Sequence, residues 1–442
     1  MLEQVFLIIG EVFVDTHLDI IDKNGPLVRL GGIFHSARAF ASLDLNYALA
    51  YYAPNYLDDD INEWSLYLNT KGCYKLGDIN RAPNIMLISE SKESGDQGYY
   101  NIIKDQAEYI ELGNIMGIIN KVKPTDILIF PGRYNTAKII KELHSFKGKI
   151  HIDFHYDIDN LVDSLDKDIE SIILSTSAPF YKNLCNGTVE GLSDYFKKQK
   201  IHQFLVKENR GGSFCFLPEE NKIYETASYY VPTMHSVGVG DVFNSIFIST
   251  ICEANLGKRM RLAALCAAKY AETMSYEKFK ANVQLVLSHL NEFVELKGIR
   301  LPWIERKNIN IYIAAPDFNS VNTDLLDELN ESLLYHNFSP RLPIRENGLV
   351  YETTSYKDEF AIYCKDIALL EECDLLIAVL LYNDPGTLVE LGMFKQSGKP
   401  TIIYDPFNNC KNMFVRHTPD YLCKNIADVI SSVYLCMGKG VN

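Results

Sequence analysis

The sequence predicts an α/β protein, and three observations indicate it. Short β-rich apolar runs alternate with helical patterns along both halves of the chain, as in α/β proteins whose sheets are largely parallel. Hydrophobic residues make up 47% and charged residues 23% of the chain, which is a globular composition. A chain of 442 residues is also too long for one ordinary core, so at least two domains are expected.

The first part of the chain provides the strands and helices of one such domain. The expected strands are Val5–Ile9, Ile127–Phe130, Ile150–Phe154, Ser171–Leu174 and Phe204–Lys207. The expected helices are Phe34–Leu43, Asp194–Lys200, Val242–Ala254, Arg261–Met274 and Val283–Leu296. Gly298 follows the last helix and is suited to end it.

Residues 299–308 are interpreted as a linker, because they contain a proline and clustered charges and directly follow Gly298. The linker separates a first domain, residues 1–298, from a second domain, residues 309–442. A new strand, Ile309–Ala314, is expected immediately after it. This order predicts two α/β domains in tandem.

Charge and composition exclude several function classes. The net charge of −14 argues against a nucleic-acid-binding protein, since an extended acidic surface does not neutralise phosphates. The ten cysteines form no C-x-x-C pair, so neither a zinc motif nor a redox motif is indicated. No segment has the length of a transmembrane helix, and the N-terminus has no basic leader. We therefore expect a cytoplasmic protein that acts on small molecules.

Polar segments follow the predicted strands of the second domain in a defined order. They are Tyr312-Ile-Ala-Ala-Pro-Asp317-Phe318, a helical stretch from Asp366 to Asp374 before the strand Leu375–Leu380, Asn383-Asp384-Pro-Gly386-Thr387-Leu-Val-Glu390-Leu-Gly392, and Gly398-Lys-Pro before the strand Thr401–Tyr404. Open α/β sheets bind ligands at the carboxyl ends of their strands. These polar side chains are therefore expected to face one ligand.

The motifs I-Y-I-A-A-P, D-L-L-I-A-V, D-P-G-T-x-x-E-L-G and G-K-P together resemble the nucleoside 2-deoxyribosyltransferase family over nearly all of the second domain. The resemblance implies a flavodoxin-like parallel sheet and Glu390 as the nucleophile that attacks the anomeric carbon. It implies that Asp384 positions the nucleophile and the sugar, and that Tyr312 holds the nucleophile. Asp366, which fits better than Asp374, would recognise or protonate the base. No cofactor is implied for this domain.

The resemblance also concerns the substrate and the assembly. Asp317, Phe318 and Gly386 are expected to contact the substrate. The stretch from Asp317 to Asn322 has no arginine, whereas relatives that hydrolyse nucleoside monophosphates carry a Ser/Arg/Gly-rich phosphate loop there. This difference favours an unphosphorylated nucleoside or another N-glycoside. Asn412 is the expected counterpart of an asparagine that relatives lend to a neighbouring subunit, so a homo-oligomer is expected.

Cleavage of an N-glycosidic bond requires these groups. Positive charge develops on the sugar, so a nearby carboxylate stabilises it and can trap it covalently, while a second acid protonates the departing base. The two acids need different pKa values, which burial and neighbouring negative charge supply. Transfer and hydrolysis differ only in the acceptor and stay open. A local interpretation also stays open, in which Thr387 and Glu390 form a capping box at N-cap and N3.

Glycine turns mark the first domain. Gly10-Glu-Val-Phe-Val-Asp15 ends the first strand, Leu30-Gly31-Gly32 opens a helix, and Ser236-Val-Gly238-Val-Gly240-Asp241 opens another. A glycine turn at a helix start offers free N–H groups to an anion. Asp241 is placed to take a proton from a hydroxyl that attacks a γ-phosphate.

These turns resemble the ribokinase-like (PfkB) carbohydrate kinases over about residues 1–298. The resemblance implies an α/β sandwich with a small β-lid, for which residues 84–100 are the candidate. It implies that Asp15, Gly31 and Gly32 lie at the sugar, that Asp241 is the catalytic base, and that Gly238 and Gly240 hold an anion or ATP phosphate. An active kinase of this type would use ATP and Mg²⁺.

The first domain departs from the kinase pattern at several positions. Ser36 stands where an asparagine is expected, His235-Ser236 replaces Asp-Thr, Asn209 replaces a glycine, and Leu174–Ala178 lies where the magnesium-ordering N-x-x-E motif is expected. His151, Asp153 and His155 alternate along one strand, and polar side chains facing a cleft are favoured there over metal ligands.

Two main hypotheses follow. The first is an enzyme with two nucleoside- or ribose-directed modules, one of which cleaves or exchanges an N-glycosidic bond while the other binds or phosphorylates a related ligand. The second is a sensor, in which an inactive kinase-like domain gates an effector that depletes nucleotides or dinucleotide cofactors. A purely non-catalytic binding protein is disfavoured, because the spacing from Asp384 to Glu390 is intact.

Overall fold

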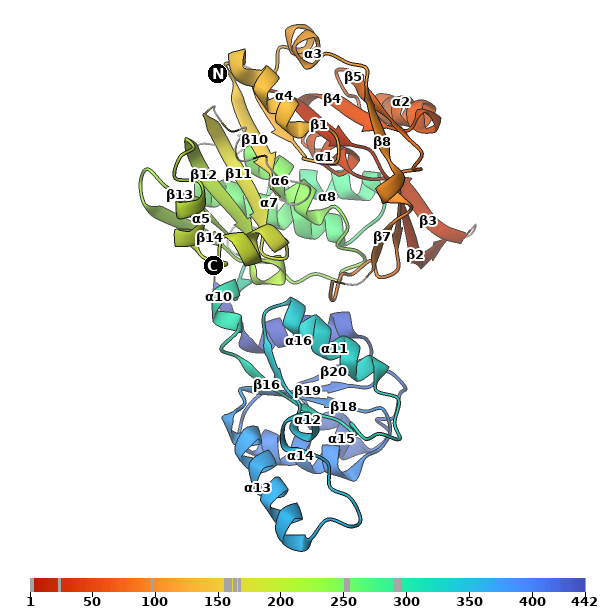
Figure 1. The fold of residues 1–442 in the computed structure, drawn as a ribbon, viewed down its shortest axis with the longest axis vertical. Coiled ribbons are helices and arrows are strands. Elements are labelled where there is room, and N and C mark those ends of the chain that lie inside the picture. Colours follow the sequence, from red (N-terminus) through yellow and green to blue (C-terminus); the bar gives the residue numbers. More distant parts are fainter. Residues whose placement is uncertain are drawn as a thin grey trace. The chain divides into compact units, whose positions relative to one another are not determined.

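The computed structural model describes residues 4–22, 25–96, 98–154, 161, 165, 168–249, 255–289, 292 and 296–441. The chain forms two compact units (Figure 1). The first comprises residues 1–93, 97–300 and 440–442, and the second comprises residues 94–96 and 301–439. The segment interpreted as a linker contains most of strand β15 (Gly298–Arg300) and helix α10 (Trp303–Arg306). The domain limits at 298 and 309 stay predictions.

A mixed sheet of ten strands forms the centre of the first unit, in the order β14-β13-β12-β11-β10-β9-β1-β4-β5-β8. Its strands are β1 (Val5–Glu11), β4 (Asn46–Ala53), β5 (Cys73–Asn80), β8 (Glu108–Glu111), β9 (Asp126–Ile129), β10 (Lys149–Asp153), β11 (Ile169–Ser175), β12 (Ile201–Lys207), β13 (Ser213–Leu217) and β14 (Lys222–Thr226). The strands from β12 to β5 run parallel. Parallel strands are covered on both faces, which is why β1 is buried along nearly its whole length.

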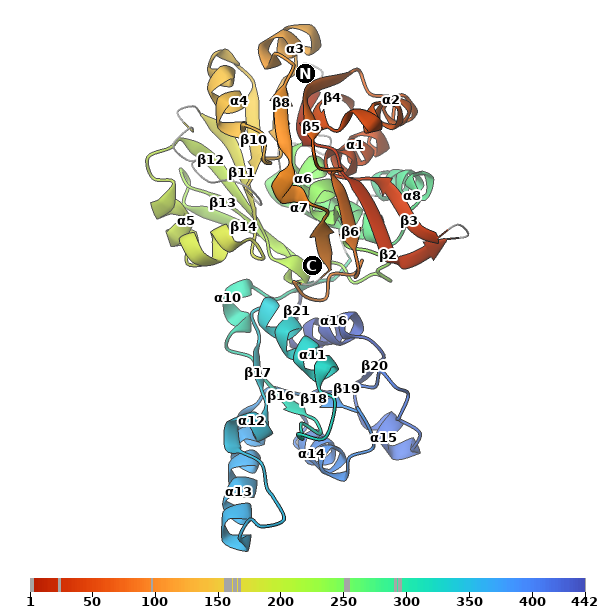
Figure 2. The ribbon, with the colours of Figure 1, turned by 45° about the vertical axis from the view of Figure 1, so that its right-hand side comes forward.

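Helices cover this sheet. They are α1 (Ile33–Ser42), α2 (Asp58–Tyr67), α3 (Ile115–Val122), α4 (Thr136–Glu142), α5 (Val189–Tyr195), α6 (Val239–Ile248), α7 (Leu256–Ala271) and α8 (Tyr276–Ser288). Helices α1, α6, α7 and α8 pack against one another as one layer (Figure 2). Their apolar faces form the largest core cluster together with β1 and β4.

Several helix starts were predicted too late or in the wrong place. Helix α7 begins at Leu256 and α8 at Tyr276, upstream of the predicted Arg261 and Val283, because Asn255 and Ser275 cap them. Helix α5 covers Val189–Tyr195 rather than 194–200, since Thr188 caps it. Residues 250–254, at the end of one predicted helix, lie outside the described residues. So does much of 290–296, at the end of another.

A second, four-stranded sheet in the order β3-β2-β6-β7 lies beside this core (Figure 2). It consists of β2 (Val14–Asp22), β3 (Gly25–Leu30), β6 (Ile85–Ile88) and β7 (Tyr99–Asn101). The stretch predicted as the lid, residues 84–100, supplies β6 and the start of β7, while β2 and β3 come from outside it. This small sheet carries Asp15 on β2 and Arg29 on β3.

The second unit is built on a parallel five-stranded sheet in the order β17-β16-β18-β19-β20, a flavodoxin-like arrangement. The strands are β16 (Asn310–Ala314), β17 (Ser339–Arg341), β18 (Leu375–Val379), β19 (Thr401–Tyr404) and β20 (Tyr421–Cys423). The helices are α11 (Asp324–Tyr335), α12 (Pro343–Asn347), α13 (Tyr356–Glu372), α14 (Pro385–Gln396), α15 (Met413–His417) and α16 (Ile426–Met437). Strand β21 (Lys439–Val441), whose last two residues return to the first unit, pairs with β15 there.

Strand β16 divides its side chains between two cores, because successive residues of a strand point to opposite faces. Ile311 and Ile313 join the cluster with α11 and α16. Tyr312 and Ala314 join the cluster that contains Leu391 and Phe394 of α14. The register of one strand therefore turns the Tyr312 side chain towards the helix that carries Glu390.

Among the residues that the structure describes, none forms a helix long and apolar enough to cross a bilayer.

Candidate functional site

The second unit brings Tyr312 and Glu390 into direct contact. Tyr312 is fully buried on β16, and its hydroxyl donates a 2.7 Å hydrogen bond to Glu390 Oε1. Glu390 is the sixth residue of α14, where the inward face of the helix meets the sheet. Burial raises the pKa of Glu390 to about 7; the Tyr312 hydrogen bond opposes this rise, while the negative charges of Asp366 and Asp384 add to it. Burial and the Glu390 carboxylate also raise the pKa of Tyr312.

Asp384 caps the helix that carries Glu390. Its Oδ2 accepts hydrogen bonds from Thr387 N at 2.7 Å and from Thr387 Oγ1 at 3.0 Å. The capping-box interpretation, with Thr387 as N-cap and Glu390 at N3, is therefore wrong. Pro385 is favoured as the first helical residue, so it sets the helix start upstream of Thr387. Glu390 lies beyond the first turn, where its carboxylate has no capping role.

Gly386 follows Pro385 in the capped turn. A Cβ atom at this position would lie 3.0 Å from Asp384 Oδ2, closer than ordinary van der Waals contact. The absence of a side chain therefore lets the Asp384 carboxylate reach the start of the helix. This geometry gives Gly386 a role in shaping the turn, and its predicted contact with substrate stays a prediction.

Asp366 lies in the middle of α13, which begins at Tyr356 rather than at Asp366 as predicted. Its Oδ1 accepts a 2.8 Å hydrogen bond from Asn347 Nδ2, donated from α12. Burial raises the pKa of Asp366, and the Asn347 hydrogen bond opposes that rise. Asp374, the alternative acid, accepts a 2.9 Å hydrogen bond from Asn310 N. Its carboxylate therefore ties β16 to the end of α13, which favours Asp366 as the acid near Glu390.

Helix α12 was not predicted, and it supplies two residues to this edge of the sheet. Arg345 pairs with Asp317, with Nε at 2.6 Å from Oδ2, and with Asp327 at 2.6 Å. Asn347 holds Asp366, as described above. Pro343 at the first helical position and Gly348 after the last are the sequence signals that could have revealed the helix. The loop after Tyr312 has no arginine of its own, so Arg345 of α12 supplies the positive charge beside it.

The remaining predicted residues of this unit are more exposed. Phe318, beside Asp317, is 37% exposed. Asn412 lies on the surface as the N-cap of α15, where its Oδ1 accepts a 2.8 Å hydrogen bond from Phe414 N. The structure therefore groups Tyr312, Glu390, Asp366 and Asp384 by contact or electrostatic influence, and leaves Asn412 as a surface cap.

In the first unit, Asp15, Gly31 and Gly32 lie together. The carboxylate of Asp15 packs directly on Gly31, where a Cβ atom would lie 2.2 Å from Oδ1. Gly32 has a positive φ of 58° and caps α1, which favours glycine. His35 Nε2, one turn into α1, lies 3.0 Å from Asp15 Oδ2. The carboxylate predicted to contact a sugar therefore already has a buried partner in this structure.

Gly238, Gly240 and Asp241 form the start of α6, as the motif indicates. Gly238 has a φ of 75°, and a Cβ atom there would lie 2.2 Å from the His35 ring. Burial and the Asp153 carboxylate raise the pKa of Asp241 to about 7, while Lys207 opposes the rise. Lys207 Nζ lies 3.4 Å from Asp153 Oδ2 and would lie 3.2 Å from a Cβ atom at Gly240. Lys207, which is not part of the glycine motif, therefore places a positive charge beside this turn.

Asp153 and His151 of the alternating strand pattern have protein partners. Asn244 Nδ2 donates a 2.5 Å hydrogen bond to Asp153 Oδ2, and His151 contacts Ser171 Oγ at 2.9 Å and Asp126 Oδ1 at 3.3 Å. His155 lies outside the described residues. Within the described ranges, no group of three or more His, Cys, Asp or Glu side chains is arranged to hold a metal ion.

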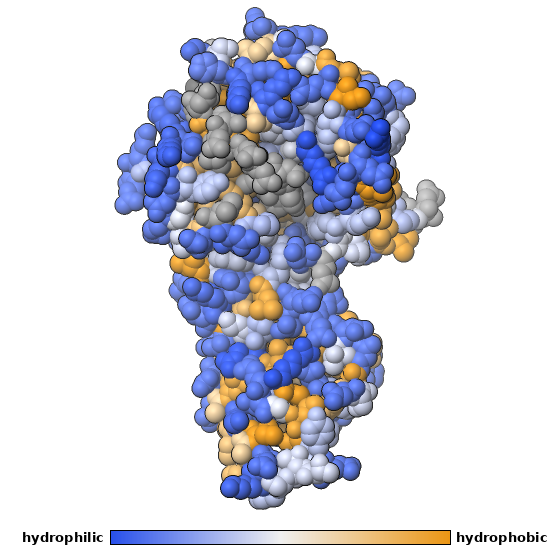
Figure 3. Space-filling model, in the orientation of Figure 1, coloured by the Kyte–Doolittle hydropathy of each residue, from blue (hydrophilic) through white to orange (hydrophobic). Residues whose placement is uncertain are grey.

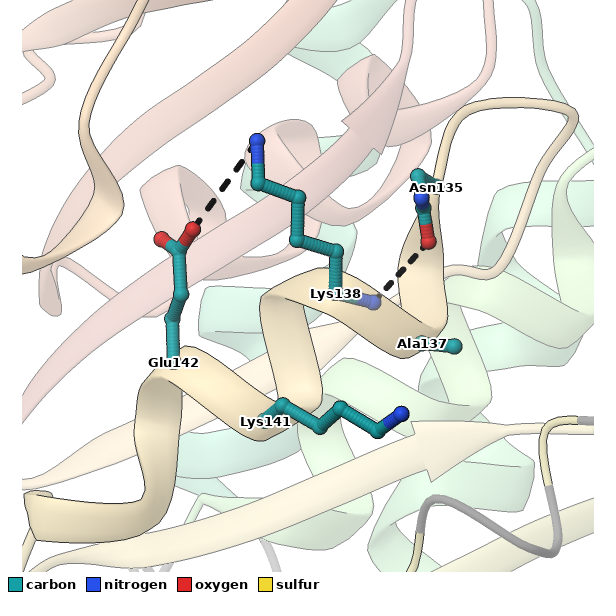
Figure 4. A pocket seen from close by; sticks show the side chains of 5 residues that line it. All are labelled: Asn135, Ala137, Lys138, Lys141 and Glu142. Carbon is teal, nitrogen blue, oxygen red and sulfur yellow. Dashed lines mark hydrogen bonds and ion pairs between the residues drawn. The ribbon is translucent and has the colours of Figure 1, made fainter.

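A surface hollow of about 450 Å³ lies along α4, lined by Asn135, Ala137, Lys138, Lys141 and Glu142 (Figure 4). Lys138 Nζ lies 4.0 Å from Glu142 Oε1 and also pairs with Glu111. None of the predicted catalytic or binding residues lines this hollow. The hollow is therefore not the candidate site.

Comparisons with known proteins agree with both units. The model of the nucleoside 2-deoxyribosyltransferase family matches residues 311–418. The structure of a fructokinase with bound ATP from Xylella fastidiosa is similar to 66% of this chain over 100% of its own length, with a TM-score of 0.50 and 12% identity. Ribokinase from Arabidopsis thaliana, complexed with ribose and ATP, aligns over 65% of this chain and 99% of its own, with a TM-score of 0.48 and 14% identity. No curated protein matches the chain in sequence.

The fructokinase similarity concerns the fold of the first unit, since the identity is too low to carry function. The family match covers the strand with Tyr312, the helix with Asp366 and the turn from Asp384 to Glu390. Both predicted fold classes are confirmed. The chain thus joins a unit with the ribokinase-like fold to a domain that matches the nucleoside 2-deoxyribosyltransferase family model at residues 311–418.

Proposed function

We propose that the second unit cleaves or exchanges the N-glycosidic bond of a nucleoside-type substrate, with Glu390 as the nucleophile. The observation that carries the proposal is the buried Tyr312 hydroxyl, which donates at 2.7 Å to the Glu390 carboxylate, whose pKa the charges of Asp366 and Asp384 help to raise. A carboxylate that is oriented by a hydrogen bond and poorly solvated is suited to attack an electrophilic carbon. A glutamate that only helps to form the helix requires neither the orienting hydrogen bond nor the poor solvation.

In the proposed reaction, a Glu390 oxygen forms a bond to the anomeric carbon as the bond to the base breaks. The electron pair of the broken bond stays on the base nitrogen, and Asp366 protonates the base as it leaves. In the second step the Asp366 carboxylate takes a proton from water, or from an incoming base, which displaces Glu390 from the sugar. The protonated Asp366 is then ready for another cycle.

The ion pair of Asp317 and Arg345 supports a substrate without phosphate. Arg345 already contacts the carboxylates of Asp317 and Asp327, so a phosphate would have to displace both. Asp317 is then free to accept hydrogen bonds from sugar hydroxyls through its remaining lone pairs. This arrangement favours a nucleoside over its monophosphate.

The test is a substrate panel with purified full-length protein. Nucleosides, deoxynucleosides, their monophosphates and NAD would each be incubated with and without a second free base, and released or exchanged base would be followed by chromatography. We expect base release or exchange from at least one unphosphorylated nucleoside. If none of the panel yields free or exchanged base, the proposed function is wrong.

Replacing Tyr312 by Phe should shift the pH dependence of base release. The Tyr312 hydrogen bond stabilises ionised Glu390 and lowers its pKa, so its loss raises the pKa of Glu390 above about 7. Because the nucleophile must be ionised, the acidic limb of the kcat/KM profile should move to higher pH. The measurement is a rate profile from pH 5 to 9. A uniform loss at every pH, with no shift of the limb, would contradict this role of Tyr312.

We propose that the first unit binds a ribose- or nucleoside-type ligand. If the protein is an enzyme with two modules rather than a sensor, this unit also phosphorylates that ligand. The start of α6 fits a phosphate, because its first amides have no partner within the helix and Lys207 lies beside Gly240. Asp241, Asp153 and Lys207 would face that group. ATP with Mg²⁺ would supply the phosphoryl group, and Asp241 would take the proton of the accepting hydroxyl.

Replacing Asp241 by Asn should lower ADP formation by roughly 100-fold or more if the first unit is a kinase, because an amide cannot accept the hydroxyl proton. The measurement is ADP production with ribose or nucleosides as acceptors. Base release by the second unit serves as the internal control and should be unchanged. Wild-type protein that forms no ADP yet binds these ligands would favour the sensor, in which the first unit gates the second without turnover.

A homo-oligomer is part of the proposal. Exposed apolar side chains occur on the second unit near α13, α14 and α15, and Figure 3 shows apolar patches among polar residues on its visible face. The most exposed of them are Tyr351, Tyr356, Phe360, Tyr363, Val389, Phe407, Met413 and Phe414. Large exposed apolar side chains in groups are typical of contact surfaces.

A further inference from the structure

The first half of helix α13 carries a row of exposed aromatic side chains. Tyr356, Phe360 and Tyr363 are 81%, 54% and 52% exposed. The ring centres of Tyr356 and Phe360 are 6.4 Å apart with 13° between the planes, and those of Phe360 and Tyr363 are 6.1 Å apart with 28°. The three stacked rings therefore form one aromatic strip along about two helical turns. Figures 1 and 2 both show this end of α13 extending away from the sheet of its unit.

This part of the helix has almost no core of its own. All 17 residues of α13 are described, and the two that are buried, Leu369 and Leu370, lie near its end. Helices in globular proteins owe most of their stability to an apolar face that packs on another element. The only apolar face in the first turns of α13 is the aromatic strip, which points to solvent in the single chain. A row of this kind is typical of a contact surface.

The aromatic strip has the spacing of a seam between two helices. Its residues are four and then three positions apart, as the d, a and d positions of a heptad are. Lys357 then lies at position e on one side of the strip, and Glu359 lies at position g on the other side. No residue three or four positions from either of them along the helix has the opposite charge. Both charges are therefore available to a neighbouring helix.

These charges distinguish two ways in which the strips of two copies can stack. In an antiparallel pair, Tyr356 of one copy faces Tyr363 of the second copy, and Glu359 comes to lie beside Glu359 of the second copy. Two like charges side by side oppose that arrangement. In a parallel pair, the g side of each helix lies beside the e side of the other, so Glu359 faces the side that carries Lys357. The two-fold symmetry of such a pair repeats this complementarity on both sides of the seam.

We propose that α13 is the interface of a homodimer, in which the aromatic strips of two copies pack against each other in parallel around a two-fold axis. Each strip residue then meets its own copy, with Phe360 at the centre of the contact. Aromatic side chains at the centre of an interface supply most of its binding energy. The pair also gives the first turns of α13 the packed apolar face that they lack in the single chain.

The occupant of the strip is a second copy rather than an unrelated protein, because one short segment supplies both the apolar row and the two complementary charges. This inference rests on the homo-oligomer of the proposed function and gives that oligomer an interface. It does not depend on base release, since its readouts are molar mass and cross-linking. A protein that releases no base and still forms this dimer would refute the proposed reaction and leave the interface standing.

The first test is the molar mass of the full-length protein, measured by sedimentation velocity over a range of concentrations. The wild type should be at least a dimer, and Phe360→Glu should weaken this association by about 10- to 100-fold, because it places two like charges at the centre of the seam. Leu334→Glu is the matched control, since Leu334 lies on α11 of the same unit and is 55% exposed, as against 54% for Phe360. It should leave the association unchanged. A monomeric wild type, or a Phe360→Glu variant that associates as tightly as the control, would overturn the proposal.

The second test is disulfide cross-linking, which distinguishes the parallel pair from the antiparallel one. Tyr356→Cys and Tyr363→Cys are introduced separately into a Cys364→Ser background, because Cys364 is an exposed cysteine beside the strip. In the parallel pair each new cysteine meets its own copy, so both variants should form disulfide-linked dimers under mild oxidation. In an antiparallel pair the two positions face each other, so at most one of the variants can cross-link. Cross-linking of only one variant, or of neither in protein that is dimeric by mass, would overturn the parallel arrangement.

Discussion

Glu390→Gln should lower base release or exchange by on the order of 10³-fold or more, because removing a covalent nucleophile removes the route through the sugar–enzyme intermediate. Gln keeps the shape of the side chain, and its carbonyl oxygen can still accept the Tyr312 hydrogen bond now made at 2.7 Å. The measurement is the initial rate of base release from the best substrate of the panel. Rapid denaturation of the wild type during turnover, followed by mass spectrometry, should reveal a sugar adduct on the peptide that contains Glu390.

The control for this prediction is Glu352→Gln, the same change at an exposed position of the second unit. It should leave the rate within about twofold, since exposed substitutions away from a site have small effects. The Glu390 variant should melt no lower than the wild type, because a neutral amide is less costly to bury than a carboxylate. Activity of Glu390→Gln within about tenfold of the wild type would remove Glu390 from the mechanism.

Asp366→Asn should lower base release by about 10²- to 10⁴-fold for purine or pyrimidine nucleosides, which is the usual contribution of a general acid. Adenine or uracil leaves as an anion unless it is protonated, and an amide cannot supply that proton. Burial raises the pKa of Asp366, so the acid retains its proton to higher pH than an exposed aspartate. The measurement is kcat/KM for a nucleoside and for nicotinamide riboside with the same variant.

Nicotinamide riboside distinguishes proton donation from a structural role. Its base already carries a positive charge on the glycosidic nitrogen and leaves as a neutral molecule, so it needs no proton. Asp366→Asn should therefore spare it, if the wild type accepts it. Asp374→Asn is the matched control, because Asp374 accepts the Asn310 amide and an asparagine oxygen can do the same. A similar loss for both kinds of base would show that Asp366 shapes the pocket rather than protonating the base.

Local sequence pattern predicted much of the fold correctly. The buried strands β1, β9, β10, β11, β12, β16, β18 and β19 all overlap predicted strands, because a short apolar run between turn residues has few alternatives. Helix starts were less predictable. Helix α13 begins ten residues before Asp366, at Tyr356, after the N-cap Ser355. Its first turns bury little apolar surface, so the amphipathic pattern that predicts a helix is weak there.

The local pattern around Glu390 allowed two interpretations, and only the structure decided between them. Thr387 and Glu390 have the spacing of a capping box, whereas Asp384 caps the helix in the structure. The cap depends on where the chain turns after β18, which a four-residue pattern does not specify. The same holds for Arg345 and Asn347, whose partners Asp317 and Asp366 are 28 and 19 residues away along the chain.

The sequence by itself determined the order of the motifs, the two α/β folds and the identity of the acids in the second unit. The tertiary structure decided which of these groups touch. It joined Tyr312 to Glu390, gave Asp366 an amide partner and placed Lys207 beside the α6 turn. The physical reason is that burial and charge pairing depend on groups far apart in sequence, and these two effects set the protonation states of the acids.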